Sequence, residues 1–229
     1  MTLLYHHPLS SASRAIRLTL SEYEIAFDVV EERVHEHRAD FLDINPAGSL
    51  PVLVDGEKPP VIGAYALSEY LDETVGALKP AKRLFPGSAM ERAEMRRLVD
   101  WALTKLEKEV VAALVHERVT KRLMASSGGG APDSTVLRTA RSALKFHLSY
   151  LDFLCSQRDW ISGNRLSFAD LAVAAGLSVL DYLGEIEWTD IDNLKDWYSR
   201  MKSRPAFRPL LADRVRGVPP VSHYVDLDF

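Results

Sequence analysis

The segment NPAGSLPVL, residues 45–53, carries the clearest structural information in this 229-residue chain. Pro46 ends a preceding helix, because a helix seldom continues past the residue before a proline. Gly48 permits a backbone turn that other residues resist. Pro51 opens a short apolar run, and proline fits at the first position of a strand, where no ladder hydrogen bond needs its amide. On its own, the segment describes a plain loop that leads into a strand.

The sequence on both sides gives this loop a more specific context. Hydrophobic periodicity and turn residues predict strands and helices in the order β-α-β-α-β-β-α. The predicted elements are a strand at 2–5, a helix at 13–22, a strand at 25–30, a helix at 37–45, strands at 51–54 and 60–62 joined at Asp55-Gly56, and a helix at 64–76. The loop therefore lies between a helix and a hairpin.

The remainder of the chain predicts only helices. A stripe of apolar residues runs through 88–124 with spacings of three and four, from Met95 to Ala113, and a second follows at 140–155. Residues 126–134 read as a loop between helices. Residues 169–183 are apolar on nearly every side, which indicates a central buried helix. Ser167 and Asp170 precede that helix with the spacing of a capping box, a structural role.

These features together resemble the glutathione transferase superfamily, with NPAGSLPVL in the place of its N-P-x-G-x-[VL]-P-x-L segment and the capping box at the start of its core helix. The resemblance implies an α+β fold. A thioredoxin-like βαβαββα domain is expected at 1–77, and an all-α helical bundle domain at 88–229. It also implies that the Leu50-Pro51 bond is cis and that the Leu50 backbone pairs with the cysteinyl part of glutathione.

Composition bounds the functions that this fold could serve. The net charge of −4 and the pI near 6.0 argue against a nucleic-acid-binding surface. No apolar run is long enough for a membrane span, and the N-terminus lacks the features of a signal peptide. The single Cys155 excludes an internal disulfide and lies on a predicted core stripe. We therefore expect a cytoplasmic protein without membrane, nucleic-acid or metal partners.

The resemblance places the chemistry at the start of the first helix. There the helix dipole and a hydroxyl would lower the thiol pKa of the co-substrate glutathione. Ser10 falls at the activating position of the serine-type theta, zeta and tau classes, and Ser11 is the neighbouring candidate. Both could instead simply begin the helix, since serine is a favoured N-cap. Tyr5 is another candidate, as in tyrosine-type classes, although burial in the sheet is an alternative.

One position departs from the family pattern. The family has an acidic residue followed by serine at the start of the third helix, where they hold the γ-glutamyl end of glutathione, but this chain has Gly63-Ala64. Backbone amides at that helix start could still bind a carboxylate. By position, His37 or Arg38 could reach the glycyl carboxylate. Retained but weak glutathione binding is the expectation.

The second-substrate pocket is expected at the first loop and on the long helix. The candidates are Tyr5, Pro8, Leu9, Trp101 and Lys105. The tail could fold over it through Tyr224 and Phe229, or could dock as a surface strap. The leading hypothesis is a homodimeric glutathione transferase for hydrophobic electrophiles, with a possible peroxidase activity and a role in detoxification. The alternatives are a non-catalytic binding protein of the same fold, and a glutathione-dependent isomerase or dehalogenase.

Overall fold

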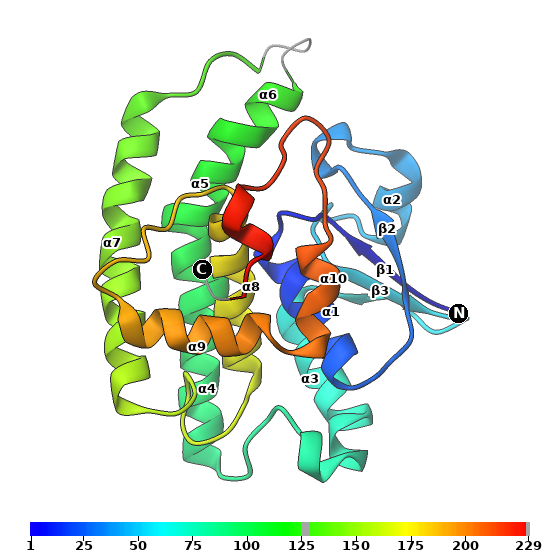
Figure 1. Ribbon diagram of the computed structural model, residues 1–229. Helices are drawn as coiled ribbons and strands as arrows, with labels where there is room; N and C mark the ends of the chain where they lie inside the picture. The colour runs from blue at the N-terminus through cyan, green and yellow to red at the C-terminus, as the bar shows by residue number, and fades with distance from the viewer. Residues whose placement is uncertain (125–128, 228–229) are drawn as a thin grey trace.

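The computed structural model describes residues 1–124 and 129–227. The predicted loop at 126–134 falls in part outside these residues, and Phe229 falls wholly outside them. Within the described residues, no helix is both long and apolar enough to cross a membrane. The structure has the expected two-part architecture, with a small mixed sheet and its helices beside a larger set of helices (Figure 1).

The sheet has the order β2-β1-β3-β4. Its strands are β1 (Thr2–His6), β2 (Asp28–Glu31), β3 (Val52–Asp55) and β4 (Val61–Ile62). β2 runs parallel to β1, whereas β3 and β4 form an antiparallel hairpin. The predicted element order is confirmed. The second strand begins three residues later than expected and extends one residue further.

Three helices cover this sheet: α1 (Ser11–Glu22), α2 (Ala39–Ile44) and α3 (Ala64–Thr74). Side chains alternate between the two faces of a strand. Leu4 and His6 of β1 are buried, and α1 and α3 pack against each other. On the other face, the Tyr5 ring packs against Phe41 of α2 with centroids 5.6 Å apart.

The long helix of the second part is continuous but not uniform. It consists of α4 (Ala89–Asp100), a π-helix at Trp101–Val111, α5 (Ala112–Val115), a second π-helix at His116–Thr120 and α6 (Lys121–Leu123). A π-turn holds more residues than an α-turn. The buried stripe therefore advances in steps of four through Ala102, Leu106 and Val110, and it continues to Leu114 rather than to the predicted Ala113.

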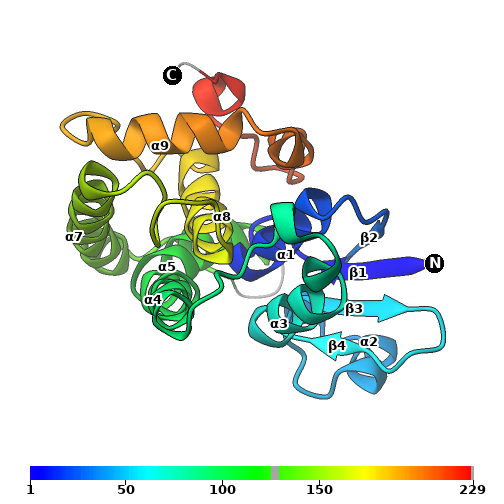
Figure 2. The same ribbon diagram turned by 90° about the horizontal axis from the view of Figure 1, so that it is seen from below.

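The remaining helices are α7 (Ser134–Gln157), α8 (Phe168–Tyr182), α9 (Asp192–Lys202) and the short α10 (Arg208–Leu211). Every residue of α8 is buried, and α8 packs against α1 and the first π-helix (Figure 2). Its predicted capping box is present, because the Asp170 carboxylate accepts from the Ser167 amide at 2.9 Å and the Ile161 amide at 2.8 Å. A buried carboxylate with these donors fixes where the core helix begins.

The C-terminal segment after α10, residues 212–227, is a strap docked on the helices. Tyr224 is fully buried, and its hydroxyl donates to the Leu210 carbonyl at 3.1 Å. The Val221 amide donates to the Tyr182 carbonyl at 3.2 Å. The described part of the tail is thus packed on α8 and α10, in agreement with the strap alternative.

Candidate functional site

Sheet register brings three distant segments to one edge. Tyr5 of β1 lies opposite Val52 of β3, and Val52 lies opposite Ile62 of β4. Pro51 therefore neighbours the end of β1, where the loop into α1 starts, and the end of β4, where α3 starts. The Gly63 amide donates to the Pro51 carbonyl at 2.9 Å, which ties the third segment to the second. This edge is the candidate site.

The loop before β3 presents backbone groups here. The Leu50-Pro51 peptide bond is cis, as the resemblance implies. Among the described residues, neither the amide nor the carbonyl of Leu50 has a hydrogen-bond partner. Leu50 is only partly exposed, and unpaired backbone groups in such a position are costly unless water or a ligand satisfies them. Leu50 can therefore pair with an extended peptide-like molecule.

At the start of α1, the structure separates the two candidate serines. Ser10 is the N-cap, and its hydroxyl oxygen accepts from the Ser13 amide at 3.2 Å. Its own proton stays available to donate, and its side chain is partly exposed. Ser11 is only 1% exposed, with its side chain directed toward Gly176 of α8. Of the two hydroxyls, the Ser10 hydroxyl is accessible, and its role in thiol activation stays a prediction.

An acidic side chain that sequence reasoning missed lies next to Ser11. Glu107, on the first π-helix, faces the Ser11 side chain, and its Oε2 atom is buried without a hydrogen-bond partner among the described residues. Burial raises the pKa of the Glu107 carboxyl, and the Ser11 hydroxyl offsets part of that rise. The start of α1 therefore has a carboxyl of this chain close to the position where a thiolate would need positive potential.

At the start of α3, only backbone groups are available to bind a ligand. Gly63 is its N-cap, with φ +85° and no side-chain cap. A residue with a side chain would be strained at this φ, so the family's acidic residue does not fit this backbone. Ala64 is buried and carries no hydroxyl. The next residue, Tyr65, donates its hydroxyl to Asp100 at 3.1 Å, which connects this end of α3 to α4.

The predicted residues around this edge have separate environments. His37 is exposed at φ +46°, after a short 3-10 turn. Arg38 is exposed and lies 3.6 Å from the buried Glu32 carboxylate. Tyr5 points to the α2 face of the sheet, away from α1. A role for these three in ligand binding stays a prediction.

The structure does not bring together the residues that were predicted to line the second-substrate pocket. Leu9 is 2% exposed and part of the core, and Pro8 is buried. Trp101 packs on Tyr150 of α7 with ring centroids 4.4 Å apart, and Lys105 lies over the Trp101 ring. Figure 2 shows α7 on the far side of the long helix from α1. Trp101 and Lys105 therefore lie with α7 and not with Pro8 and Leu9.

A buried arginine holds the first loop in place. Arg14, fully buried on α1, donates to the Pro8 carbonyl at 2.5 Å, to Ser178 of α8 at 2.8 Å and to the Tyr224 hydroxyl at 3.0 Å. One guanidinium thus joins the loop, the core helix and the tail, with the planar fork geometry that suits arginine for such junctions. In the sequence, the feature that could have identified this role is a charged residue on the apolar face of the first helix.

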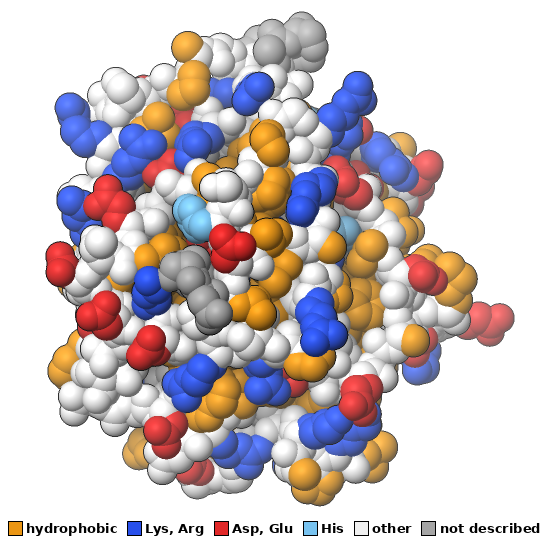
Figure 3. Space-filling model, in the orientation of Figure 1, with side chains coloured by type: hydrophobic (Ala, Val, Ile, Leu, Met, Phe, Trp, Pro, Cys, Tyr) orange, Lys and Arg blue, Asp and Glu red, His pale blue; other side chains and the backbone are white. Residues whose placement is uncertain are grey.

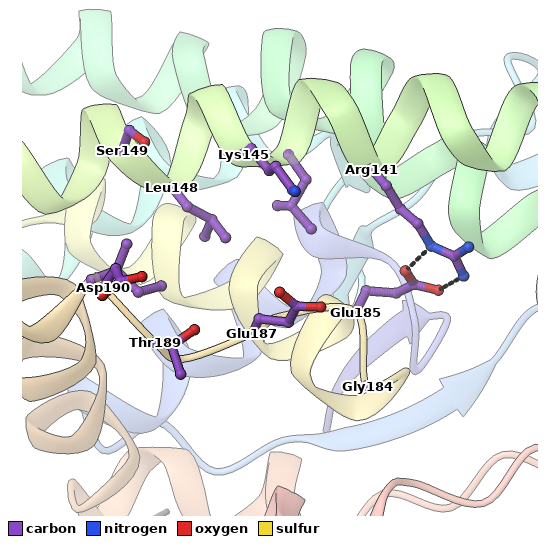
Figure 4. Close-up of a pocket in the computed structure, with 11 residues that line it drawn as sticks. Arg141, Lys145, Leu148, Ser149, Gly184, Glu185, Glu187, Thr189 and Asp190 are labelled. Carbon is purple, nitrogen blue, oxygen red and sulfur yellow. Dashed lines mark hydrogen bonds and ion pairs between the residues drawn. The ribbon is translucent and has the colours of Figure 1, made fainter.

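A separate cavity of about 660 Å³ lies between α7 and the connection from α8 to α9 (Figure 4). Lys145 of α7 and Glu187 of the connection approach it from opposite sides. Arg141 forms a bidentate ion pair with the nearly buried Glu185 carboxylate, with distances of 2.8 and 3.1 Å. No residue of the sheet edge lines this cavity, so it is not part of the candidate site.

Cys155 is not a candidate nucleophile. It is a free, partly buried cysteine, and burial raises the pKa of its thiol to about 12. A thiol with such a pKa is almost wholly protonated at neutral pH, whereas the thiolate is the reactive form.

Comparison with known families places both parts of the chain. A family model described as the glutathione S-transferase N-terminal domain matches residues 4–79, and one described as the glutathione S-transferase C-terminal domain matches residues 133–214. The two matches correspond to the sheet with its helices and to the region from α7 to the strap.

Three individual proteins show how the similarity is distributed. FtsZ-localized protein A of Caulobacter vibrioides is 43% identical over 99% of this chain and 97% of its own length. Glutathione S-transferase GstB of Escherichia coli is 28% identical over 92% and 98%, respectively. The crystal structure of a glutathione S-transferase from Sinorhizobium meliloti is 55% identical, covers both chains completely and superimposes with a TM-score of 0.97.

Proposed function

Since this chain belongs to the glutathione S-transferase family, we propose that it is a binding protein of that fold which associates with FtsZ, and that glutathione transfer is weak or lost. A non-catalytic binding protein of the same fold is one of the alternatives that the sequence allows. It is supported by the whole-length similarity to FtsZ-localized protein A.

The observation that carries the loss of transfer is the backbone at Gly63-Ala64. A φ of +85° at Gly63 leaves no unstrained place for an acidic side chain, and Ala64 supplies no hydroxyl. One missing charge-assisted hydrogen bond costs about 1.5–3 kcal/mol, or about ten- to a hundredfold in affinity.

Glu107 is a second feature that disfavours glutathione transfer. If its carboxylate is ionised, it repels a thiolate held at the start of α1. Thiol ionisation there would require Glu107 to stay protonated.

A second candidate, a glutathione transferase using Ser10, rests on different observations. The unpaired Leu50 backbone and the accessible N-cap hydroxyl are the groups such an enzyme would use. The similarity to the Sinorhizobium meliloti protein is in line with this reading.

FtsZ association is tested by sedimentation of purified protein with polymerised FtsZ of the same organism, and by co-localisation of a fluorescent fusion with FtsZ in cells. We expect co-sedimentation and a shared position in the cell. Protein that remains in the supernatant and spreads evenly through the cell would remove the proposal.

Glutathione transfer is tested by calorimetry with glutathione and by turnover of an aryl halide, in the wild type, Ser10→Ala, Ala64→Ser and Glu107→Gln. We expect weak or no binding by the wild type and a gain on Ala64→Ser or Glu107→Gln. Rapid wild-type turnover that Ser10→Ala abolishes would establish the transferase instead.

We also propose that the chain is a homodimer. Phe146 and Phe153 on α7 are each 59% exposed, and they share a helix face with Tyr150, beside Trp101. Exposed aromatic residues that follow one another along a helix favour a protein contact over solvent.

A further inference from the structure

A second cavity, of about 400 Å³, lies where α6, the segment after β2 and the C-terminal strap meet. Its lining comes from four places in the sequence, including His7, the segment around Arg33, Arg122 of α6 and Arg216 of the strap. Figure 3 shows Lys and Arg side chains, interspersed with carboxylates, distributed over this face of the molecule. The first loop, the long helix and the tail all contribute to it, as predicted for the second-substrate pocket, but none of the residues predicted for that pocket lines it.

The strap presents Arg216 on a rigid turn. The Val218 amide donates to the Val215 carbonyl at 3.0 Å, and Gly217 between them has φ +75°, a conformation that favours glycine. The Tyr182 hydroxyl holds both ends of this turn, because it accepts from the Val215 amide at 2.9 Å and donates to the Val218 carbonyl at 2.7 Å. The backbone that carries Arg216 is thus fixed to the buried core helix.

The charges of the cavity are not balanced. Arg33 lies 3.7 Å from Glu31 and 3.2 Å from Glu36, so these two carboxylates are already partnered. Arg122 and Arg216 have no ion-pair or hydrogen-bond partner among the described residues. Three arginines against two glutamates leave a formal charge of +1, concentrated on the side of α6 and the strap.

His7 adds a neutral donor. Its Nδ1 atom accepts from the Leu9 amide at 3.2 Å, and burial lowers the pKa of its imidazole. A neutral imidazole that accepts at Nδ1 carries its proton on Nε2. His7 can therefore donate to an acceptor in the cavity, in addition to the two guanidinium groups.

We propose that this cavity binds a small organic acid, whose carboxylates are held by Arg122 and Arg216 and whose apolar part packs on Leu123 and Val215. Guanidinium groups bind carboxylates through paired, charge-assisted hydrogen bonds. The volume lies within the usual range for small-molecule sites. The proposal requires neither glutathione nor FtsZ, so it stands or falls separately from the proposed function.

The test uses a matched pair of probes, phenylsuccinate and its neutral diamide, which share a shape but differ in charge. Binding to the full chain is measured by ligand-observed NMR and calorimetry at millimolar concentrations and at two salt concentrations. We expect the diacid to bind, more weakly in high salt, and the diamide to bind at least about tenfold more weakly.

Variants then locate the site. Arg122→Gln and Arg216→Gln should each weaken diacid binding about tenfold, the effect of losing one charge-assisted contact. Arg138→Gln, at an exposed arginine of α7 that does not line the cavity, is the matched control and should bind as the wild type does. Because all three positions are on the surface, folding is expected to be retained, and circular dichroism verifies it.

Three results would overturn the proposal: no binding of the diacid, equal binding of diacid and diamide, or full binding by both cavity variants. An acidic peptide that binds through Arg122 and Arg216 where phenylsuccinate does not would also overturn it, in favour of a protein-binding surface.

Discussion

Acidification should destabilise this protein through His6. The residue ends β1 on the face covered by α1, is 5% exposed, and has no hydrogen-bond partner for Nδ1 among the described residues. Burial lowers the pKa of His6 from 6.5 to about 4, with further lowering by the charge of Arg17 and an opposing effect of Asp213. His7 and Arg14 also face it and lower the pKa slightly.

Proton linkage gives the direction in which stability changes with pH. Between pH 6.5 and about 4 the unfolded chain binds a proton at this histidine that the folded chain does not. Stability is therefore fully present above the unfolded pKa and is lost as the pH falls through this window. The loss reaches about 2 kcal/mol at about pH 5 and about 3 kcal/mol once the folded pKa is passed.

The assay is urea unfolding of the wild type and His6→Gln at about pH 7.5 and about pH 5. Glutamine removes the titrating group, so the stability difference between the two pH values should shrink by about 2 kcal/mol in the variant. His35→Gln, at an exposed histidine, is the control and should leave the difference unchanged. His7, whose pKa burial also lowers, is present in the wild type and both variants, and the charge of His35 is a lesser cause of that lowering than burial.

A direct measurement guards against a variant that folds poorly. An NMR titration of the wild-type imidazole should place the His6 pKa far below that of an exposed histidine. A titration midpoint near the ordinary value for histidine would refute the reasoning, as would an unaltered pH dependence in His6→Gln.

The other predictions concern the core helix, the strap and the dimer. Asp170→Ala leaves three buried donors without an acceptor, the Ile161 and Ser167 amides and the Trp197 indole, so unfolding free energy should fall by about 3–5 kcal/mol in urea titrations; a loss below about 1 kcal/mol would contradict this. Tyr224→Phe removes one partner of the fully buried Arg14 and should cost about 2–3 kcal/mol, measured in the same way, with increased proteolysis of the tail; a strap that stays protected at wild-type stability would show the bond to be unimportant. Phe146→Ser with Phe153→Ser should convert a dimer to a monomer in sedimentation experiments, and an unchanged mass would show that this face is not the interface.

Features fixed by local chemistry could be predicted well from sequence. Pro51 and the turn at Asp55-Gly56 led to the correct prediction of the hairpin, because proline and glycine constrain the backbone wherever they occur. Ser167 and Asp170 correctly located the start of the core helix for the same kind of reason, since a capping box needs only residues three apart. The sequence alone shows Gly63-Ala64 as a departure from the family pattern.

The positions of other site residues depended on which face of the long helix carries each side chain. The resemblance predicted Trp101 and Lys105 in the pocket because they lie on the long helix, but in the structure Trp101 packs on Tyr150 of α7 and Lys105 lies over the Trp101 ring. The same helix carries Glu107 to Ser11, from a position 96 residues further along the chain. Helical periodicity shows which residues share a face of a helix, but it does not show which other element packs against that face.

The sequence by itself thus determined the architecture, since the order of elements along the chain, the turns and the helix starts follow from short-range backbone preferences and from the burial of apolar stripes. Tertiary structure alone decided which polar groups share an environment: Ser10 open and Ser11 buried, Glu107 at the start of α1, and Arg14 joining the loop to the tail. The physical reason is that electrostatic and hydrogen-bond energies depend on distances between atoms of separate elements, which packing sets and sequence spacing does not.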